Sequence, residues 1–217
     1  TRMNNHKSRP ENQQEALLES IRELCRVFWG PTREACDQMM QERYLLSFAT
    51  LDPELKISPS NALEQLAEIL KGFPGPDALF NYLEEGYVRL FVNDRGRIIA
   101  PLYESCYEDE KNPRLMGDAA VRIQKRLESE GMNISDDIRE PPDHLSIELE
   151  LLYFLLTRSK PANNRMPEAA AFATQLLPWV TCFNARLANE TRCRFYPLIT
   201  AVLVAVLQWV DGLQHQG

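Results

Sequence analysis

The sequence predicts an all-α protein, an irregular bundle of about nine to eleven helices. In most segments apolar residues recur every three or four positions, which is the spacing of one helix face. Few residues alternate as strands do: residues 97–101 read as a short strand, but nothing pairs with it convincingly. The 217 residues are 44% hydrophobic, which suffices for a packed core.

The N-terminal part is expected to contain five helices, at residues 11–29, 32–41, 44–51, 58–71 and 76–91. In the first, Leu17, Ile21 and Leu24 share one face, and Gly30 ends the helix. The fifth is followed by a turn-prone Asn-Asp-Arg-Gly sequence at residues 93–96.

The C-terminal part is expected to contain helices at residues 113–131, 143–158, 167–188 and 194–213. The polar, proline-limited stretch before residue 143 predicts a hinge that joins a helical part at residues 1–139 to another at 140–217; the two can pack as one globular unit. Residues 195–210 are very apolar but contain Pro197 and are shorter than a membrane span of about 20 residues, so we expect a buried helix.

The hinge segment, residues 140–144, has the sequence Glu-Pro-Pro-Asp-His. Pro141 and Pro142 fix their own φ angles and push the preceding residues out of the helical region. Asp143 is then expected to cap the next helix through its carboxylate. His144, in the first turn and beside acidic residues, is expected to change charge readily near neutral pH.

Charge and composition limit the class of function. The 24 basic and 31 acidic residues give a net charge of −7, which argues against nucleic-acid binding and favours basic ligands. Five cysteines without a CxxC pair are typical of reduced, partly buried thiols. With no apolar signal segment near residue 1, we expect a cytoplasmic protein.

Two catalytic readings of the sequence are weak. Glu140, His144 and Glu148 are spaced four apart as metal ligands on a helix would be, but the prolines separate Glu140 from that helix, so no metal site is expected. Ser105 and Cys106 could be nucleophiles, but no base can be assigned to them.

Three local patterns occur in one order along the chain. They are PLYESCY at residues 101–107, EPPDHLSIELELLYFLL at 140–156, and LLPWVTCF with RFYPLITAVLVAVLQW between 176 and 209. Together they resemble the TorD/DmsD family of cytoplasmic redox-enzyme maturation chaperones. The likeness spans residues 79–209, and the hinge sequence with its apolar helix is the most specific part.

The resemblance implies a protein without catalytic chemistry or cofactor that binds the twin-arginine (Tat) signal peptide of a molybdenum-cofactor oxidoreductase subunit. It would hold the apo subunit until cofactor is inserted and so prevent premature export. The Tat translocase and cofactor-biosynthesis proteins are further partners it implies. One alternative is an assembly chaperone of a non-exported nitrate-reductase-type subunit; a weaker one is a protein that binds or hydrolyses GTP.

The resemblance also implies which residues bind the peptide: Tyr87, Leu90, Phe91, Pro101, Tyr103, Tyr107, Glu140, Pro142, Asp143 and His144. It further implies weak GTP binding at Asp143 and His144. Such a receptor needs an apolar groove bordered by carboxylates, where an arginine could pair with Glu140 or Asp143. Aromatics at helical spacing are more often core, so Tyr87, Leu90 and Phe91 have that alternative reading. Both a monomer and a domain-swapped dimer are compatible with the hinge.

Overall fold

The computed structural model describes residues 9–41, 43–55, 58–92, 98–109, 114–158 and 166–213. It contains the helices α1 (Arg9–Trp29), α2 (Arg33–Met39), α3 (Leu46–Leu51), η1 (Asp52–Glu54), α4 (Ser60–Lys71), α5 (Pro76–Tyr87), η2 (Val88–Val92), α6 (Ser105–Glu108), α7 (Asp118–Ser129), α8 (Leu145–Thr157), α9 (Met166–Leu187) and α10 (Phe195–Gly212). No strand is assigned in these ranges. The predicted all-α fold is therefore confirmed.

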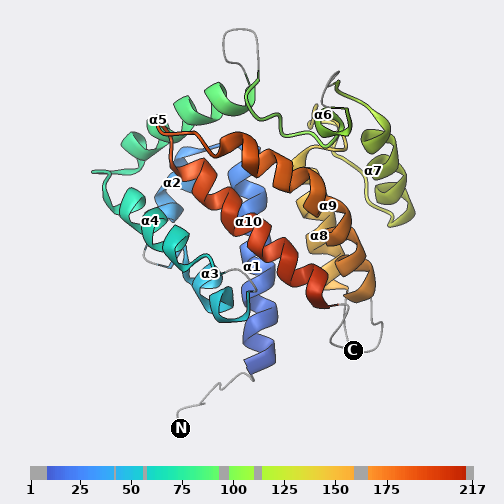
Figure 1. Cartoon of the computed structure of the whole chain (residues 1–217), viewed down its shortest axis with the longest axis horizontal. Coiled ribbons are helices and arrows are strands. Elements are labelled where there is room, and N and C mark those ends of the chain that lie inside the picture. The colour runs from blue at the N-terminus through green and yellow to red at the C-terminus, as the bar shows by residue number, and fades with distance from the viewer. Residues whose placement is uncertain are drawn as a thin grey trace.

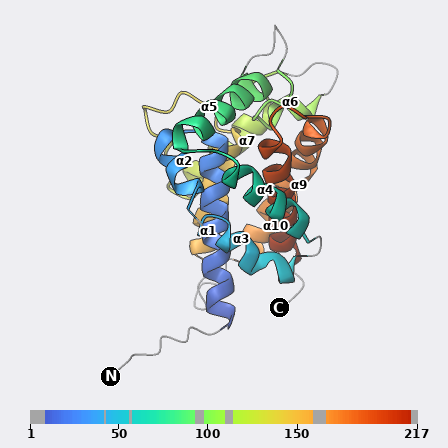
Figure 2. The ribbon, with the colours of Figure 1, turned by 90° about the vertical axis from the view of Figure 1, so that its left-hand side faces the viewer.

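The helices form an irregular bundle rather than an up-and-down arrangement (Figures 1 and 2). The first helix, α1, packs along α8 and α3, while α10 packs along α9 and α4. Helix α5 lies at one end of the bundle against α2, and α6 contacts α7 and α9. Helices from the first half of the chain thus pack directly on helices from the second.

One hydrophobic core runs through both halves of the chain. At its centre, Phe91 of η2 makes ring contacts with Phe28 of α1, Phe183 of α9 and Tyr196 of α10, at centroid distances between 4.9 and 6.4 Å. Residues 1–139 and 140–217 therefore contribute to the same core wherever the structure describes them. Whether they can separate at residues 140–144 stays a prediction.

The boundaries of several predicted elements differ in the structure. The helix expected at 76–91 changes at Val88 into a π-helical turn, and the helix expected from residue 113 begins at Asp118. The prediction of a strand at residues 97–101 is wrong for the described residues 98–101, where the Ala100 amide donates to the Leu90 carbonyl, 2.9 Å away, outside any sheet. Residues 93–97 lie outside the described ranges, so the predicted turn there is not tested. The four-residue helix α6 was not predicted, because one turn leaves no periodic pattern.

The apolar C-terminal helix is a core helix. By length and composition α10 could cross a membrane, yet more than half of that segment is buried inside the fold. Leu203, Val206 and Val210 are fully inaccessible to solvent. The prediction of a buried helix is thus confirmed. The prediction of partly buried free thiols holds as well: Cys182 is exposed and the other four cysteines are buried.

Candidate functional site

The two most specific sequence patterns meet in space as a short antiparallel bridge. Tyr103 and His144 form an isolated β-bridge. The Leu145 amide donates to the Leu102 carbonyl at 2.8 Å, and the Glu104 amide donates to the Asp143 carbonyl at 3.1 Å. Residues 101–107 and 140–145 are therefore one structural unit, which we call the bridge.

Asp143 anchors the bridge from inside the protein. It is fully buried, and one carboxylate oxygen accepts hydrogen bonds from both the Ser105 amide, at 2.9 Å, and the Ser105 hydroxyl. The Ser105 hydroxyl in turn accepts from the Gly117 amide at 3.0 Å. The prediction that Asp143 caps the next helix is wrong, because its carboxylate serves the other strand of the bridge.

His144 is the residue that caps α8. Its Nδ1 accepts from the Ser146 amide at 3.2 Å, and its φ and ψ of −72° and 134° are those of extended backbone. The ring stacks on Trp29, with centroids 5.0 Å apart, and meets the Tyr103 ring edge-on. Burial lowers the pKa of His144 to about 4, although the charges of Glu140 and Asp143 oppose this shift. The expectation of a charge change near neutral pH is therefore wrong: the imidazole is neutral there.

A half-buried group of aromatic side chains covers the bridge. It consists of Trp29, Tyr87 and Tyr103 together with Glu140, and we call it the aromatic surface. The Tyr103 hydroxyl donates to the Glu140 carboxylate at 2.6 Å, and the Tyr87 hydroxyl donates to the Phe28 carbonyl at 3.1 Å. Burial, with a further contribution from Glu140, raises the pKa of Tyr87 to about 12. Both tyrosines are thus neutral donors, and their rings remain partly open to solvent.

Comparison with known proteins decides which family this architecture belongs to. The family model described as nitrate reductase delta subunit matches residues 52–185. A chaperone protein TorD from Psychrobacter sp. (strain PRwf-1) is 30% identical over 162 residues, which cover 71% of this chain and 72% of that protein. The chain belongs to the TorD family of redox-enzyme maturation chaperones.

Two further similarities accompany that assignment. A chaperone protein TorD from Actinobacillus succinogenes is 29% identical over 182 residues, covering 81% of this chain and 88% of that protein. A solved protein from Archaeoglobus fulgidus, described as a candidate redox enzyme maturation protein, aligns with 95% of this chain at 19% identity and a TM-score of 0.48, too low to add to the assignment.

The residues predicted to bind a peptide in this TorD-family chain lie in different environments. Tyr87, Tyr103, Glu140 and Pro142 are half-buried, so they are partly open to solvent. Pro101, Asp143 and His144 are buried in or under the bridge.

The remaining predicted residues do not belong to the aromatic surface, although the Phe91 ring contacts the Tyr87 ring from the core. Leu90 and Phe91 are core residues, at 0% and 3% exposure, so a peptide could reach them only after a rearrangement. Tyr107 packs against α9, where the Arg186 guanidinium lies 4.2 Å from its ring centroid, and its hydroxyl donates to the Pro101 carbonyl. Their predicted contact with a peptide is not tested by this arrangement.

Sequence reasoning missed Trp29 as a site residue. The indole Nε1 donates to Glu150 at 3.0 Å, and the ring covers His144. In the sequence Trp29 only marks the end of the first helix, and no pattern links it to a histidine more than a hundred positions later. A residue of this kind is found only from the packing of α1 on α8.

Three carboxyl groups lie buried behind the bridge, and sequence reasoning missed them as a cluster. They belong to Glu104, Asp143 and Glu148, whose exposures are 7%, 0% and 0%. Arg122 binds the Glu104 carboxylate at 2.7 Å. Burial raises the pKa of Glu148 well above its usual range, and the adjacent Glu104 adds to the shift. Glu148 therefore keeps its proton to a higher pH than an exposed carboxyl does.

The structure gives the catalytic readings no support. Within the described ranges, no group of three or more His, Cys, Asp or Glu side chains is arranged to hold a metal ion. The Ser105 hydroxyl is engaged by Asp143 and Gly117, and burial raises the pKa of the Cys106 thiol. Neither side chain is placed as an activated nucleophile.

Proposed function

We propose that this TorD-family chain is a cytoplasmic, non-enzymatic chaperone that binds the twin-arginine signal peptide of a molybdopterin oxidoreductase catalytic subunit. It would aid cofactor insertion into that apo subunit and prevent premature export. The observation that carries the proposal is the aromatic surface: Trp29, Tyr87 and Tyr103, half-buried beside Glu140 on the bridge that holds the most specific family pattern.

The aromatic surface matches the chemistry of such a peptide. Aromatic rings supply large contact areas for an apolar segment and lose little conformational freedom. The Glu140 carboxylate uses one oxygen to accept from Tyr103, so the other can accept from a positively charged side chain. The net charge of −7 also favours rapid association with a cationic peptide, an effect that salt weakens.

Nucleotide binding is less well supported than peptide binding. Asp143 and His144, the residues implied for GTP, are buried at 0% and 2% exposure, and each accepts hydrogen bonds from the protein itself. A nucleotide could contact them only if the bridge opened. Weak GTP binding by an opened form is a proposal that no contact in this conformation favours.

A second candidate function is assembly of a non-exported nitrate-reductase-type subunit. It is supported by the match to the family described as nitrate reductase delta subunit. Such a client would be recognised through an N-terminal segment without paired arginines. The Tat translocase and cofactor-biosynthesis proteins would be further partners only in the export-linked case.

We expect a synthetic leader peptide, an Arg-Arg pair followed by a run of leucine and alanine, to bind the full chain with micromolar affinity. Replacing the pair by Lys-Lys should weaken binding about tenfold, because a compact ammonium cannot reproduce the two parallel hydrogen bonds of a guanidinium. Isothermal titration calorimetry at low and high salt measures the affinities of the Arg-Arg and Lys-Lys peptides.

The outcomes separate the two candidates. Equal affinity for the Arg-Arg and Lys-Lys peptides would favour the non-exported client. Failure of both peptides to bind at low salt would contradict recognition of a twin-arginine leader.

A further inference from the structure

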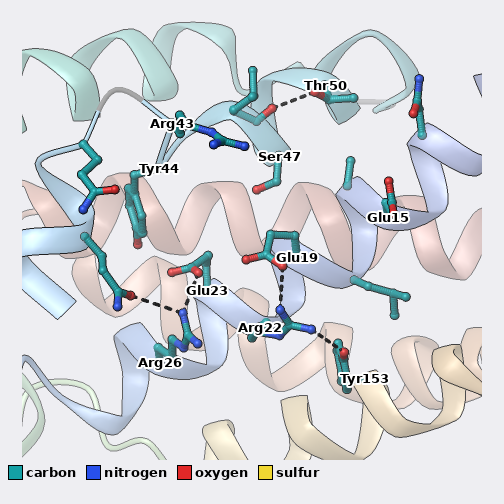
Figure 3. Close-up of a pocket in the computed structure, with 16 residues that line it drawn as sticks. Glu15, Glu19, Arg22, Glu23, Arg26, Arg43, Tyr44, Ser47, Thr50 and Tyr153 are labelled. Atoms are coloured by element: carbon teal, nitrogen blue, oxygen red, sulfur yellow. Dashed lines mark hydrogen bonds and ion pairs between the residues drawn. The ribbon is translucent and has the colours of Figure 1, made fainter. Parts of the chain in front are cut away.

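A cavity lined mainly by polar residues lies beside α1 (Figure 3). Its volume is about 990 Å³. Helix α1 forms one wall, the segment from α2 to α3 forms the other, and Tyr153 of α8 lies at the edge. A cavity of this size can hold a small ligand or the side chains of a peptide.

Two hydroxyl groups in the second wall have no hydrogen-bond partner among the described residues. They belong to Tyr44, which is only 8% exposed, and to Ser47, whose hydroxyl is also buried. In Figure 3 the Tyr44 side chain points toward α1, on the side of Glu23. Buried polar groups are nearly always paired, so two unpaired hydroxyls on one cavity wall indicate a place where a ligand completes them.

The α1 wall carries a row of carboxylates. Glu15, Glu19 and Glu23 are spaced four residues apart, so they share one face of the helix. Glu19 accepts from Arg22 at 2.8 Å and Glu23 accepts from Arg26 at 2.9 Å, each through a single oxygen.

The Glu23 carboxylate is buried beside a like charge. Burial raises the pKa of Glu23; Arg26 opposes the shift, and both the charge of Glu19 and a side-chain hydrogen bond with Glu19 add to it. A further cation placed between Glu19 and Glu23 would relieve both the burial and the mutual repulsion.

The bridge offers few carboxylates to a positively charged peptide. Asp143 is fully buried and bound to Ser105, and Glu140 already accepts from Tyr103. At most one bridge carboxylate can therefore meet a positively charged peptide, although a leader carries a pair of arginines. The cavity supplies the additional acidic groups.

We propose that the cavity between α1 and α3 binds the guanidinium group of an arginine in the client's N-terminal segment. Glu19 and Glu23 are its ion-pair partners, and the Tyr44 and Ser47 oxygens accept its remaining N–H groups. This inference rests on the proposed function, since it assigns one element of the same peptide to a second place on the molecule. Arg22, Arg26 and Arg43 also line the cavity and match its three carboxylates in number, so the experiment below includes inorganic phosphate as the competing anionic ligand.

The test compares the Arg-Arg leader peptide with full-length variants by calorimetry. The double variant Glu19→Gln, Glu23→Gln should lose at least tenfold in affinity. Tyr44→Phe removes only an unpaired hydroxyl, so it should lose about threefold while its thermal stability stays equal to that of the wild type or rises. The control is Glu64→Gln, an exposed residue of α4, which changes the net charge equally per substitution and should leave affinity unchanged.

The site and the proposed function fail in distinguishable ways. If the leader binds the wild type and the double variant equally, the cavity is not an arginine site, while the chaperone function stands. If the leader does not bind at all, the function fails, and N-acetylarginine amide followed by amide NMR tests the cavity alone: shifts around Tyr44 and Glu19 support it and their absence overturns it. Two further results would overturn the proposed arginine site. One is tighter binding of spermidine than of the leader peptide, and the other is tighter binding of inorganic phosphate, at Arg43, than of the leader peptide.

Discussion

Asp143→Ala is expected to lower the free energy of unfolding by about 3 kcal/mol. The substitution removes the oxygen that accepts from both the Ser105 amide and the Ser105 hydroxyl, and it leaves these donors unpaired in a buried position. Because the Asp143 backbone is itself part of the bridge, the loss should also loosen residues 101–107. Urea denaturation followed by circular dichroism measures the change.

Two further variants are compared with Asp143→Ala. Asp143→Asn keeps an acceptor oxygen and should cost roughly half as much, because a neutral acceptor makes weaker hydrogen bonds than a carboxylate. Asp136→Ala, in the exposed part of the loop before the bridge, should change stability by less than about 0.5 kcal/mol. A loss below about 1 kcal/mol in Asp143→Ala would show that the carboxylate does not hold the bridge.

Glu148→Gln is expected to stabilise the protein at neutral pH and to flatten its dependence on pH. The folded protein keeps a proton on the buried Glu148, because burial raises the pKa of this carboxyl well above that of the unfolded chain. Glutamine is neutral without binding a proton, and its amide supplies N–H donors beside the Glu104 carboxylate. The expected gain at pH 7.5 is on the order of 2 kcal/mol.

The direction in which stability changes with pH follows from the number of protons bound by the folded and unfolded states. Above pH 4.5 the unfolded chain has lost the Glu148 proton while the folded protein keeps it, so wild-type stability falls as pH rises until the folded group ionises. His144 acts in the opposite direction: its folded pKa of about 4 lies below its usual 6.5, so its contribution is lost as pH falls through that window. Above pH 6.5 His144 is neutral in both states and no longer contributes.

The wild type and Glu148→Gln are therefore best compared between pH 6.5 and 8, where His144 does not contribute to the pH dependence. There the wild-type free energy of unfolding should decline by up to about 1.4 kcal/mol per pH unit from Glu148, and the glutamine variant should lack this decline. Chemical denaturation at several pH values measures both slopes. Equal slopes would mean that Glu148 is already ionised in the folded protein.

The helices of this chain could be predicted from the sequence because each has a local cause. Leu17, Ile21 and Leu24 show the periodicity of α1, and Gly30 ends it; the two prolines of the hinge fix where α8 can begin. The pairing of the hinge with residues 101–107 was not predicted; the two patterns were linked only through their resemblance to one family. Its physical basis, the hydrogen bonds from Ser105 to Asp143, joins residues 38 positions apart, which no local rule detects.

The site residues were harder to predict than the helices. Helical spacing cannot distinguish an aromatic that lines a groove from one that fills a core, and Leu90 and Phe91 are core. The cap of α8 was assigned one residue early, because a buried serine competes for Asp143 and leaves His144 to bind the helix amide. Glu19 and Glu23 were not predicted as site residues, because acidic residues four positions apart on a helix are also typical of a solvated face.

The most direct test of the chaperone account is the affinity of the Arg-Arg leader peptide for Tyr103→Ala. The control is Tyr82→Ala, another half-buried tyrosine, which packs on Phe73 away from the bridge. If the aromatic surface binds the leader, Tyr103→Ala loses at least tenfold in affinity while Tyr82→Ala keeps that of the wild type. Equal affinities in all three proteins would contradict the account.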